Sequence, residues 1–405
     1  MGKPEIRFKG YTDEWEQRKL KEIADKVSEK NKNNEFSEPF TNSAEQGIIS
    51  QKDYFDREIV NNENLDGYYI VRNDDFIYNP RISATAPVGP INRNRLGRNG
   101  VMSPLYTVFR THDIDNLYLE FYFKTTKWHR FMKLNGDSGA RFDRFTISST
   151  QFMEMPIPYP TLEEQQKIGK YFDSLDHLIT LHQRKCDEVK SLKKYMLQKM
   201  FPQNEQKVPE IRFEGFTEAW EQRKLGDVLE RRIEQRQQSE EYPRLAFASG
   251  QGVIPLSERK TNNREQLTKD EYTKKYLVTE LNDIVYNPAN VKYGAIDRNK
   301  CRRGLISPIY VTFTTNEIPG FIERIVTSHD FQQRALRFEE GTVTKRQSVN
   351  PEDLVTLDIL VAPKREEQQK IATYFDSLDH LITLHQQKCE ELKKIKKFML
   401  QKMFV

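Results

Sequence analysis

Two stretches of the chain, residues 163–201 and 366–404, carry apolar or semi-apolar side chains spaced alternately by three and four almost throughout. This spacing is typical of a helix that packs one narrow stripe against another helix. The stripe is Ile168, Phe172, Leu175, Ile179, His182, Cys186, Val189, Leu192, Met196 and Met200 in the first stretch, and Ile371, Phe375, Leu378, Ile382, His385, Cys389, Leu392, Ile395, Met399 and Met403 in the second. The pattern predicts two helices of about 38 residues, each roughly 57 Å long.

The flanking residues mark where the first helix begins and ends. Pro156, Pro158 and Pro160 exclude a helix interior before it, because proline lacks the backbone donor that a helix needs. Thr161, followed three residues later by Glu164, predicts a capping box. Pro202 predicts the end of the helix.

The charges along the two stretches indicate how the helices pair. Residues 163–182 have a net charge of −2 and residues 183–201 a net charge of +4, and the halves 366–385 and 386–404 carry −3 and +4. Antiparallel pairing sets acidic halves against basic halves. The macrodipole of a single helix would favour the same polarity, so this alternative stays open. We expect an antiparallel coiled coil built on Ile168, Phe172, Leu175 and Ile179 of one helix and Ile371, Phe375, Leu378 and Ile382 of the other.

The chain is an internal duplication. Between residues 163–201 and 366–404, 31 of 39 positions are identical. Shorter islands recur at similar offsets: residues 4–20 and 209–225, 46–49 and 251–254, 75–80 and 283–288, and 100–106 and 304–310. Between the islands the copies diverge, either through drift in surface loops or because the copies bind different things. A molecule with two like halves suits a ligand with two like halves, and duplex nucleic acid is the commonest.

Each copy contains a globular block before its helix. Short strand-like runs, such as residues 68–71 and 106–109, alternate with Gly, Pro and Asn turns, and residues 117–134 have an aromatic-rich helical pattern that residues 318–338 match. We interpret those aromatics as core. The expected fold class is α+β, with globular blocks at 1–160 and 204–362, long helices at 161–203 and 363–405, and pseudo-two-fold symmetry.

Composition narrows the class of protein. The 405 residues include 37% hydrophobic and 31% charged residues, no run of 18 apolar residues and only three cysteines. This favours a protein of the reduced cytoplasm, without a membrane span or disulfide framework. The N-terminus has no apolar signal core. The net charge of only +4 does not by itself indicate nucleic-acid binding, so the position of the positive charge matters.

Basic residues gather in two glycine-flanked segments of each block. The first is residues 92–100, matched by 296–304, and the second is 136–144, matched by 341–349. Arg and Lys there could hold phosphates or read guanine, and Asn and Gln could read adenine. Residues 43–47 and 249–252 are weaker polar candidates. A solvated surface would also account for such charge.

Common catalytic signatures are missing from the sequence. We find no Gly-rich cofactor loop after a strand, no phosphate loop and no catalytic triad pattern. Asn79-Pro80 and Asn287-Pro288 are similar to the Asn-Pro-Pro-Tyr motif of amino-methyltransferases, but lack its second proline and aromatic residue. His182 with Cys186, and His385 with Cys389, are interpreted as small core residues rather than metal ligands. We therefore expect no catalysis, no cofactor and no metal in this chain.

The order of block, helix, block and helix resembles the specificity subunit of type I restriction–modification enzymes. The matching residues are the Asn-Pro turns at 79–80 and 287–288, the Gly-x-x-Ser-Pro-x-Tyr segments at 100–106 and 304–310, and the Pro-x-x-x-Glu-x-Gln entry to each helix at 160–166 and 363–369. The resemblance implies a target recognition domain at 1–160 and another at 204–362, each reading half of a split DNA site. It implies that the helices set the unread gap and dock two modification (methyltransferase) subunits, which restriction subunits with motor and nuclease activity then join. S-adenosylmethionine, ATP and magnesium would belong to those partners.

Under this hypothesis the basic segments contact double-stranded DNA. The candidate residues are Arg93, Arg95, Arg98, Arg141 and Arg144 for one half-site, and Arg298, Lys300, Arg302, Lys345, Arg346 and Gln347 for the other. Two other classes remain as alternatives. One is a non-catalytic coiled-coil scaffold that binds proteins, and the other is a stand-alone DNA nuclease or methyltransferase. The bases read and the length of the gap do not follow from the sequence.

Overall fold

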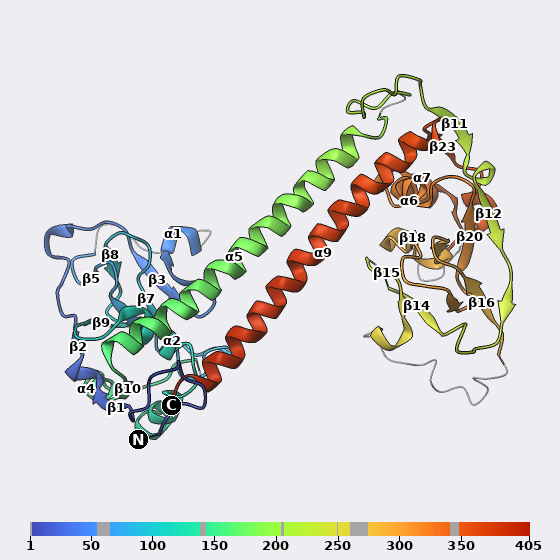
Figure 1. Ribbon diagram of the computed structural model, residues 1–405. Coiled ribbons are helices and arrows are strands. Elements are labelled where there is room, and N and C mark those ends of the chain that lie inside the picture. Colours follow the sequence, from blue (N-terminus) through green and yellow to red (C-terminus); the bar gives the residue numbers. More distant parts are fainter. Residues whose placement is uncertain are drawn as a thin grey trace. The chain divides into compact units, whose positions relative to one another are not determined.

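The computed structural model describes residues 2–54, 65–137, 143–203, 206–248, 250–259, 274–340 and 348–405. Its contacts divide the chain into two compact units. The first unit comprises Met1–Gln183 together with Gln386–Val405, and the second comprises Arg184–His385. Helix α5 (Leu162–Lys199) and helix α9 (Arg365–Lys402) each begin in one unit and end in the other (Figure 1). Each unit therefore contains a globular part and one half of each long helix.

The globular part of the first unit is a mixture of short strands and short helices, as its many Gly, Pro and Asn turns predict. In chain order the elements before α5 are β1 (Glu16–Lys19), η1 (Leu20–Glu22), β2 (Ala24–Lys26), η2 (Lys32–Asn34), β3 (Phe40–Ser43), β4 (Gly47–Ser50), α1 (Gln51–Tyr54), β5 (Tyr69–Val71), β6 (Phe76–Tyr78), β7 (Ile91–Arg93), β8 (Gly100–Met102), β9 (Thr107–Thr111), α2 (Asn116–Phe123), α3 (His129–Asn135), α4 (Ser149–Met153) and β10 (Pro156–Tyr159).

The second unit repeats this order with a few additions. Its elements before α9 are β11 (Glu221–Lys224), η3 (Leu225–Asp227), β12 (Leu229–Arg232), β13 (Gln235–Arg236), β14 (Leu245–Ala248), β15 (Gly252–Pro255), η4 (Leu256–Glu258), β16 (Tyr276–Thr279), β17 (Ile284–Tyr286), η6 (Pro288–Tyr293), β18 (Ile296–Arg298), β19 (Gly304–Ile306), β20 (Val311–Thr315), α6 (Pro319–Val326), α7 (His329–Ala335), η7 (Leu336–Phe338), β21 (Glu339–Glu340), β22 (Ser348–Val349), α8 (Pro351–Leu354) and β23 (Asp358–Val361).

The sheets of the two units have the same topology. A four-stranded antiparallel sheet has the order β2-β9-β6-β7 in the first unit and β12-β20-β17-β18 in the second. The pairs β1-β10, β3-β4 and β5-β8 return as β11-β23, β14-β15 and β16-β19, and β13 adds an edge to the last pair. The expectation of two similar α+β blocks is confirmed.

The aromatic-rich segment lies in the core, as expected, but it is two helices rather than one. Helix α2 ends at Phe123 because side chains divert the backbone there: the Thr125 hydroxyl donates to the Tyr122 carbonyl at 2.7 Å, and the Trp128 indole donates to the Phe123 carbonyl at 3.0 Å. Phe121 and Trp128 are buried. The matched segment of the second unit is also split, into α6 and α7.

The predicted helix stripes lie in the core of each unit, except that Leu192 of the first stripe is 44% exposed. In the first unit Ile168, Phe172 and Leu175 are buried and Ile179 is half-buried, in one cluster with residues of the other long helix, Leu392, Ile395, Met399, Met403 and Phe404. In the second unit Ile371, Phe375 and Leu378 are buried with Val189, Met196, Leu197, Met200 and Phe201, and Ile382 is half-buried.

The two helices run antiparallel within each unit. In the first unit Asp176 forms an ion pair with Lys396, and three residues further along α5 the Ile179 carbonyl lies 4.0 Å from the Cys389 Sγ, seven residues back along α9. In the second unit Asp379 pairs with Lys193, and the Ile382 carbonyl lies 4.0 Å from the Cys186 Sγ. The antiparallel prediction is confirmed, and the contacts of one unit recur in the other. Both cysteines are buried between the helices.

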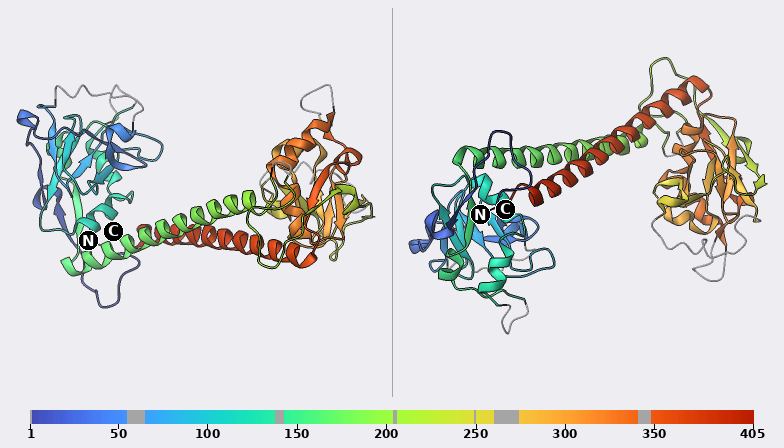
Figure 2. Two further views of the ribbon diagram at one scale, coloured as in Figure 1. Left: turned by 90° about the horizontal axis from the view of Figure 1, so that it is seen from above. Right: turned by 60° about the horizontal axis from the view of Figure 1, so that its bottom comes forward.

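The shared segments 4–8 and 209–213 tie the two long helices together. The Arg7 guanidinium makes two bonds, of 2.7 and 2.8 Å, to the buried Glu164 carboxylate in the first turn of α5. The Ile6 amide donates to the Lys402 carbonyl at the end of α9 at 3.1 Å. Arg212 binds Glu367 at 2.6 and 2.8 Å in the same way, and the Ile211 amide donates to the Lys199 carbonyl at 2.9 Å. Accordingly, N and C lie side by side in Figures 1 and 2.

These contacts alter the expected capping box. The Thr161 hydroxyl accepts from the Glu164 amide at 3.3 Å, as predicted. The Glu164 carboxylate, however, binds Arg7 instead of completing the box, because a guanidinium offers a buried carboxylate a stronger, two-pronged partner than a backbone amide does. The adjacent Gln165, also buried, accepts from the Asp115 amide at 2.9 Å and donates to the Pro160 carbonyl at 2.8 Å.

A small residue is needed where each long helix crosses the short helix beside it. A Cβ added at Gly169 of α5 would lie 2.7 Å from the Cβ of Leu117 in α2, closer than real Cβ atoms approach. At the matched contact of the second unit the sizes are exchanged: Ala372 of α9 faces Gly320 of α6, where an added Cβ would lie 3.0 Å from the Ala372 Cβ. In each unit one partner is therefore a glycine.

Candidate nucleic-acid interface

The first basic segment of each unit begins on a β-strand. Successive side chains of a strand point to opposite faces, and this determines which side each basic residue lies on. Arg93 ends β7, and Arg95 lies two residues later, so both cations lie on the same side while Asn94 between them faces the other way. Both cations contact Glu120 of α2: the Arg93 Nε lies 2.9 Å from one carboxylate oxygen, and the Arg95 Nη1 lies 3.6 Å from the other.

The pairing leaves the cations of the first unit differently exposed. Arg93 also contacts Asp74 at 3.1 Å, and only 9% of its side chain is exposed. Arg95 contacts Asp173 of α5 at 2.7 Å but is 47% exposed. Arg98 forms two bonds of 2.8 Å with Glu38 and is 49% exposed, and these bonds hold the pKa of Glu38 below its usual value. Arg95 and Arg98 therefore remain accessible to an anion from outside.

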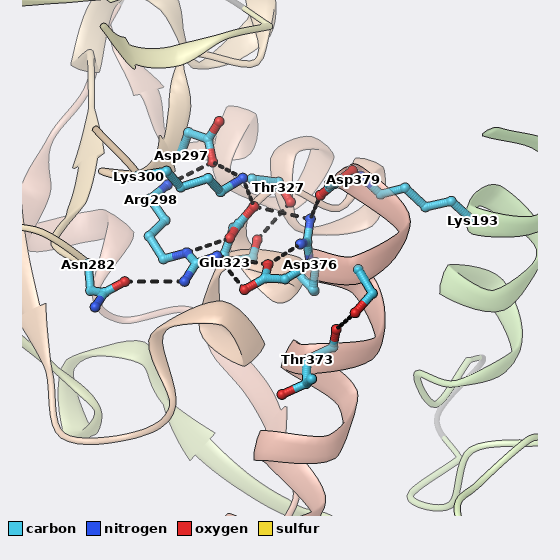
Figure 3. A network of polar contacts seen from close by, with 12 residues as sticks. Lys193, Asn282, Asp297, Arg298, Lys300, Glu323, Thr327, Thr373, Asp376 and Asp379 are labelled. Atoms are coloured by element: carbon cyan, nitrogen blue, oxygen red, sulfur yellow. Dashed lines mark hydrogen bonds and ion pairs between the residues drawn. The ribbon is translucent and has the colours of Figure 1, made fainter. Parts of the chain in front are cut away.

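The second unit has the same arrangement around Glu323 (Figure 3). Arg298 ends β18, with its Nε 2.7 Å from Glu323, and Lys300, two residues later, lies 2.5 Å from the same carboxylate. Arg298 also binds Asp376 of α9 and is only 12% exposed. Arg302 is exposed. Arg303, which is not among the residues predicted to contact DNA, is 47% exposed and pairs with Glu280 and Glu241 at 2.8 Å.

The asparagines of these segments shape the backbone. The Asn94 side chain is fully buried and donates to the carbonyls of Arg72 and Arg98 at 2.9 and 3.0 Å. Asn299, also buried, donates to the carbonyls of Glu280 and Arg302 at 2.9 Å. The idea that asparagines in these segments read adenine is wrong for these two, because a buried, fully occupied amide cannot reach a base edge. In the sequence, these two structural asparagines can be found as the central residue of a cation–Asn–cation triplet that occurs in both copies.

Only one candidate of the second basic segment lies in the part of the chain that the structure describes. Arg144 is half-buried, and its backbone bridges to that of Arg81. Arg141, Lys345, Arg346 and Gln347 fall outside the described residues. All DNA contacts proposed for these basic residues remain predictions.

The Asn-Pro turns have structural roles. The Asn79 side chain donates to the Asn42 carbonyl at 2.8 Å and accepts from the Arg81 amide at 2.9 Å. The Asn287 side chain accepts from the Ala289 amide at 3.1 Å and caps η6. The Asp that begins each of these islands is buried as well: Asp75 binds Arg110, and Asp283 binds Arg232. Burial raises the pKa of Asp283 although Arg232 opposes the shift.

Two features are absent from the described residues. No group of three or more His, Cys, Asp or Glu side chains among them is arranged to hold a metal ion. None of the described helices combines the length and the apolar character needed to span a bilayer.

Part of this chain is similar to a known protein family. Residues 12–191 match the family model described as type I restriction modification DNA specificity domain. Residues 12–191, somewhat less than half of the chain, are thus similar to this domain. A protein of Methanocaldococcus jannaschii that is assigned as the specificity subunit of the type I restriction enzyme MjaX is 23% identical over 266 residues. That match spans 62% of this chain and 59% of the relative, less than two thirds of its length.

One solved structure from a type I restriction–modification system has a similar fold over its whole length. The S subunit of a type I restriction–modification system from M. genitalium matches with a TM-score of 0.60 at 12% identity, over 100% of this chain and 99% of that chain. The HsdS subunit from Thermoanaerobacter tengcongensis matches over 98% of both chains, with a TM-score of 0.45 at 14% identity.

Proposed function

We propose that this chain is the DNA sequence-specificity subunit of a type I restriction–modification complex, in which each globular part reads one half of a bipartite DNA site. The observation that carries the proposal is the duplication: one specificity-domain topology occurs in two compact units that share their framework contacts. Two differing half-sites fit two units whose frameworks agree and whose intervening sequences diverge.

We expect the half-exposed cations to make the contacts with DNA. Arg95, Arg98, Arg302 and Arg303 lie at the surface of the two matched segments, three of them paired with carboxylates at the rim. A phosphate can replace such a carboxylate, and a guanidinium can also bind the guanine edge in the major groove. Arg93 and Arg298 are largely buried and paired with carboxylates of their own unit. They would therefore hold the segment in position instead of contacting DNA.

The long helices would set the unread gap and dock two modification subunits. Beside the buried stripe, each unit exposes large apolar side chains of both helices: Leu178 and Phe398 in the first, Leu381, Leu384 and Tyr195 in the second, all at least 39% exposed. Apolar residues that recur on a helix face in water mark a surface that another protein covers. Methylation with S-adenosylmethionine, and restriction with ATP and magnesium by restriction subunits, would take place on these partners. This chain would contribute no catalytic group.

Single-molecule methylation mapping tests the proposal in cells. The chain is expressed together with its modification subunit in a host that lacks restriction–modification systems, and a matched strain carries the modification subunit alone. We expect a split adenine-methylated motif only where this chain is present. Lack of any chain-dependent motif, despite an assembled complex, would overturn the proposal.

Variants at the two segments test the division into half-sites. Arg98→Ala and Arg302→Ala, each in the assembled complex, should weaken DNA binding and lower its salt dependence by about one counterion if the side chain contacts a phosphate. A base contact would instead relax one position of one half-site. A variant that alters neither binding nor sequence preference removes that residue from the interface.

A further inference from the structure

In the second unit, charged side chains from four elements meet at one place (Figure 3). Glu323 of α6, only 2% exposed, contacts Arg298 at 2.7 Å, Lys300 at 2.5 Å and Arg324 at 3.1 Å. The basic segment after β18 is thereby bonded to α6 through a carboxylate that water does not reach.

The same cations continue onto the long helices. Arg298 donates to both oxygens of Asp376 on α9, at 2.8 and 2.9 Å, and Arg324 donates to Asp376 at 2.8 Å. Arg324 also lies 2.9 Å from Asp379, one helical turn further, and Asp379 pairs with Lys193 of α5. An unbroken series of ion pairs therefore joins the basic segment to both long helices within this unit. We call this set of residues the joint network: Lys193, Asp297, Arg298, Lys300, Glu323, Arg324, Asp376 and Asp379.

The charges of the joint network balance, with four cations and four carboxylates. Buried ion pairs often add little to stability, since desolvation offsets their attraction. Such ion pairs instead fix the relative orientation of the groups they join, because a guanidinium that makes several bonds at fixed angles permits only one arrangement. Arg298 and Arg324 each contact two or more carboxylates and so determine how the globular part is seated on the helices.

A split DNA site makes this orientation important. Adding one base pair to the gap moves the second half-site by about 3.4 Å and rotates it by roughly 35°. A protein can distinguish neighbouring gaps only if each recognition part is held to the helices more tightly than that. Resting on the proposed function, we infer that the joint network is this attachment, and that Asp376, Arg324 and Asp379 are positioning residues for gap length.

The first unit has a reduced form of the same device. Glu120 binds Arg93 and Arg95, and Arg95 reaches Asp173 of α5, the position that matches Asp376. The position of Arg324 is held by Phe121, which packs against Phe172 with ring centroids 5.2 Å apart. In the first unit, aromatic packing by Phe121 therefore replaces the guanidinium of Arg324. Because only the second unit has the full joint network, the test uses that unit.

The test uses the assembled complex and a set of DNA duplexes with identical half-sites and gaps changed by one or two base pairs. Asp376→Asn is the main variant, because its side chain is 41% exposed and its loss need not prevent folding. Lys193→Gln is a second variant, which removes the α5 end of the joint network without altering its core. Glu352→Gln is the control, since Glu352 forms an exposed pair with Arg231 in the same unit and neither residue belongs to a long helix.

We expect Lys193→Gln to lower the ratio of methylation at the native gap to methylation at neighbouring gaps by about fivefold, the effect of losing one partly exposed ion pair. Asp376→Asn, which loses its pairs with Arg298 and Arg324, should lower this ratio at least as much. Half-site preference should not change, and the control should match the wild type. A general loss of stability would lower methylation equally at every gap. Unchanged ratios in both folded variants would overturn the inference, whereas a wild-type complex without any gap preference would count against the proposed function itself.

Discussion

Glu164 and Glu367 are carboxylates with no access to water, each held by one arginine from a segment far away in sequence. Neutralising one partner of such a pair leaves a guanidinium without its counter-charge in a dry environment. The helix would lose its contact with segment 4–8 or 209–213, and with it the link between the two long helices.

Glu164→Gln should lower the free energy of unfolding by about 3 kcal/mol, since breaking a buried ion pair costs far more than breaking an exposed one. Glu163→Gln is the matched control: the neighbouring carboxylate is 73% exposed and pairs with Lys167 on the surface. Urea unfolding followed by circular dichroism compares the two. Equal midpoints for the two variants would show that the Arg7–Glu164 pair does not hold the helices.

Acid should loosen the second unit through Asp379. Burial acts to raise the pKa of Asp379, but the hydrogen bond from Lys193 and the charge of Arg324 outweigh it and hold the pKa below its usual value. A carboxylate whose folded pKa lies below its unfolded value of about 3.9 stabilises the fold fully above that pH and loses this contribution as the pH falls through the folded pKa.

We therefore expect hydrogen exchange in α6 and the first half of α9 to accelerate as the pH is lowered below about 4, after correction for intrinsic exchange rates. Asp379→Asn should exchange faster at neutral pH and show a smaller change on acidification. Identical pH dependence in both proteins would contradict the assignment.

At this scale the sequence predicts where charge gathers but not what neutralises it. The basic segments 92–100 and 296–304 stand out in the sequence. Glu120 and Glu323 do not, because they lie 27 and 25 residues downstream of the arginines they bind, inside apolar helices. Only the fold shows that Arg93 and Arg298 face inward whereas Arg98 and Arg303 face outward.

At the scale of elements, the long helices follow closely from their apolar spacing, and the aromatic-rich segments do not. Apolar or semi-apolar residues spaced by three and four over ten positions are sufficient to predict α5 and α9 as helices. Residues 117–123 are apolar at every position except Glu120, so no periodic pattern marks where this helix ends. The bonds from Thr125 and Trp128 that end it are local side-chain contacts, which an apolar pattern does not encode.

The end of α9 provides a test of which apolar residues carry the first unit. Phe404→Ala should destabilise that unit by about 3–5 kcal/mol, because Phe404 is buried against Tyr118 and Phe172. Phe398→Ala, near the end of the same helix but 50% exposed, should leave stability nearly unchanged. Thermal unfolding measures both, and an equal shift in melting temperature would show that α9 does not complete the core.

At the scale of the whole molecule, the duplication and the charge of the helix halves predict that the long helices pair antiparallel. The ion pairs Asp176–Lys396 and Asp379–Lys193 confirm this pairing within the units. The reason is general: a pattern repeated over 39 residues averages out local exceptions. The bases recognised cannot be predicted in this way, because a base contact depends on single side chains whose direction the surrounding loop decides.

Adding four residues to both long helices at matched points tests their role as the spacer. One extra turn in each would lengthen the helix pair by about 6 Å. Methylation mapping should then show an unchanged pair of half-sites with a longer gap. An insertion that leaves the gap as it was would reject the idea that these helices measure it.

The division of the chain has a consequence for synthesis. Residues 184–385, which form the second unit, are contiguous, whereas the first unit needs residues 386–405 to close its core around Phe404. Translation proceeds from the N-terminus at about 5–20 residues per second. The N-terminal block therefore keeps an apolar face uncovered until residues 386–405 have been made. The half that is made first is finished last.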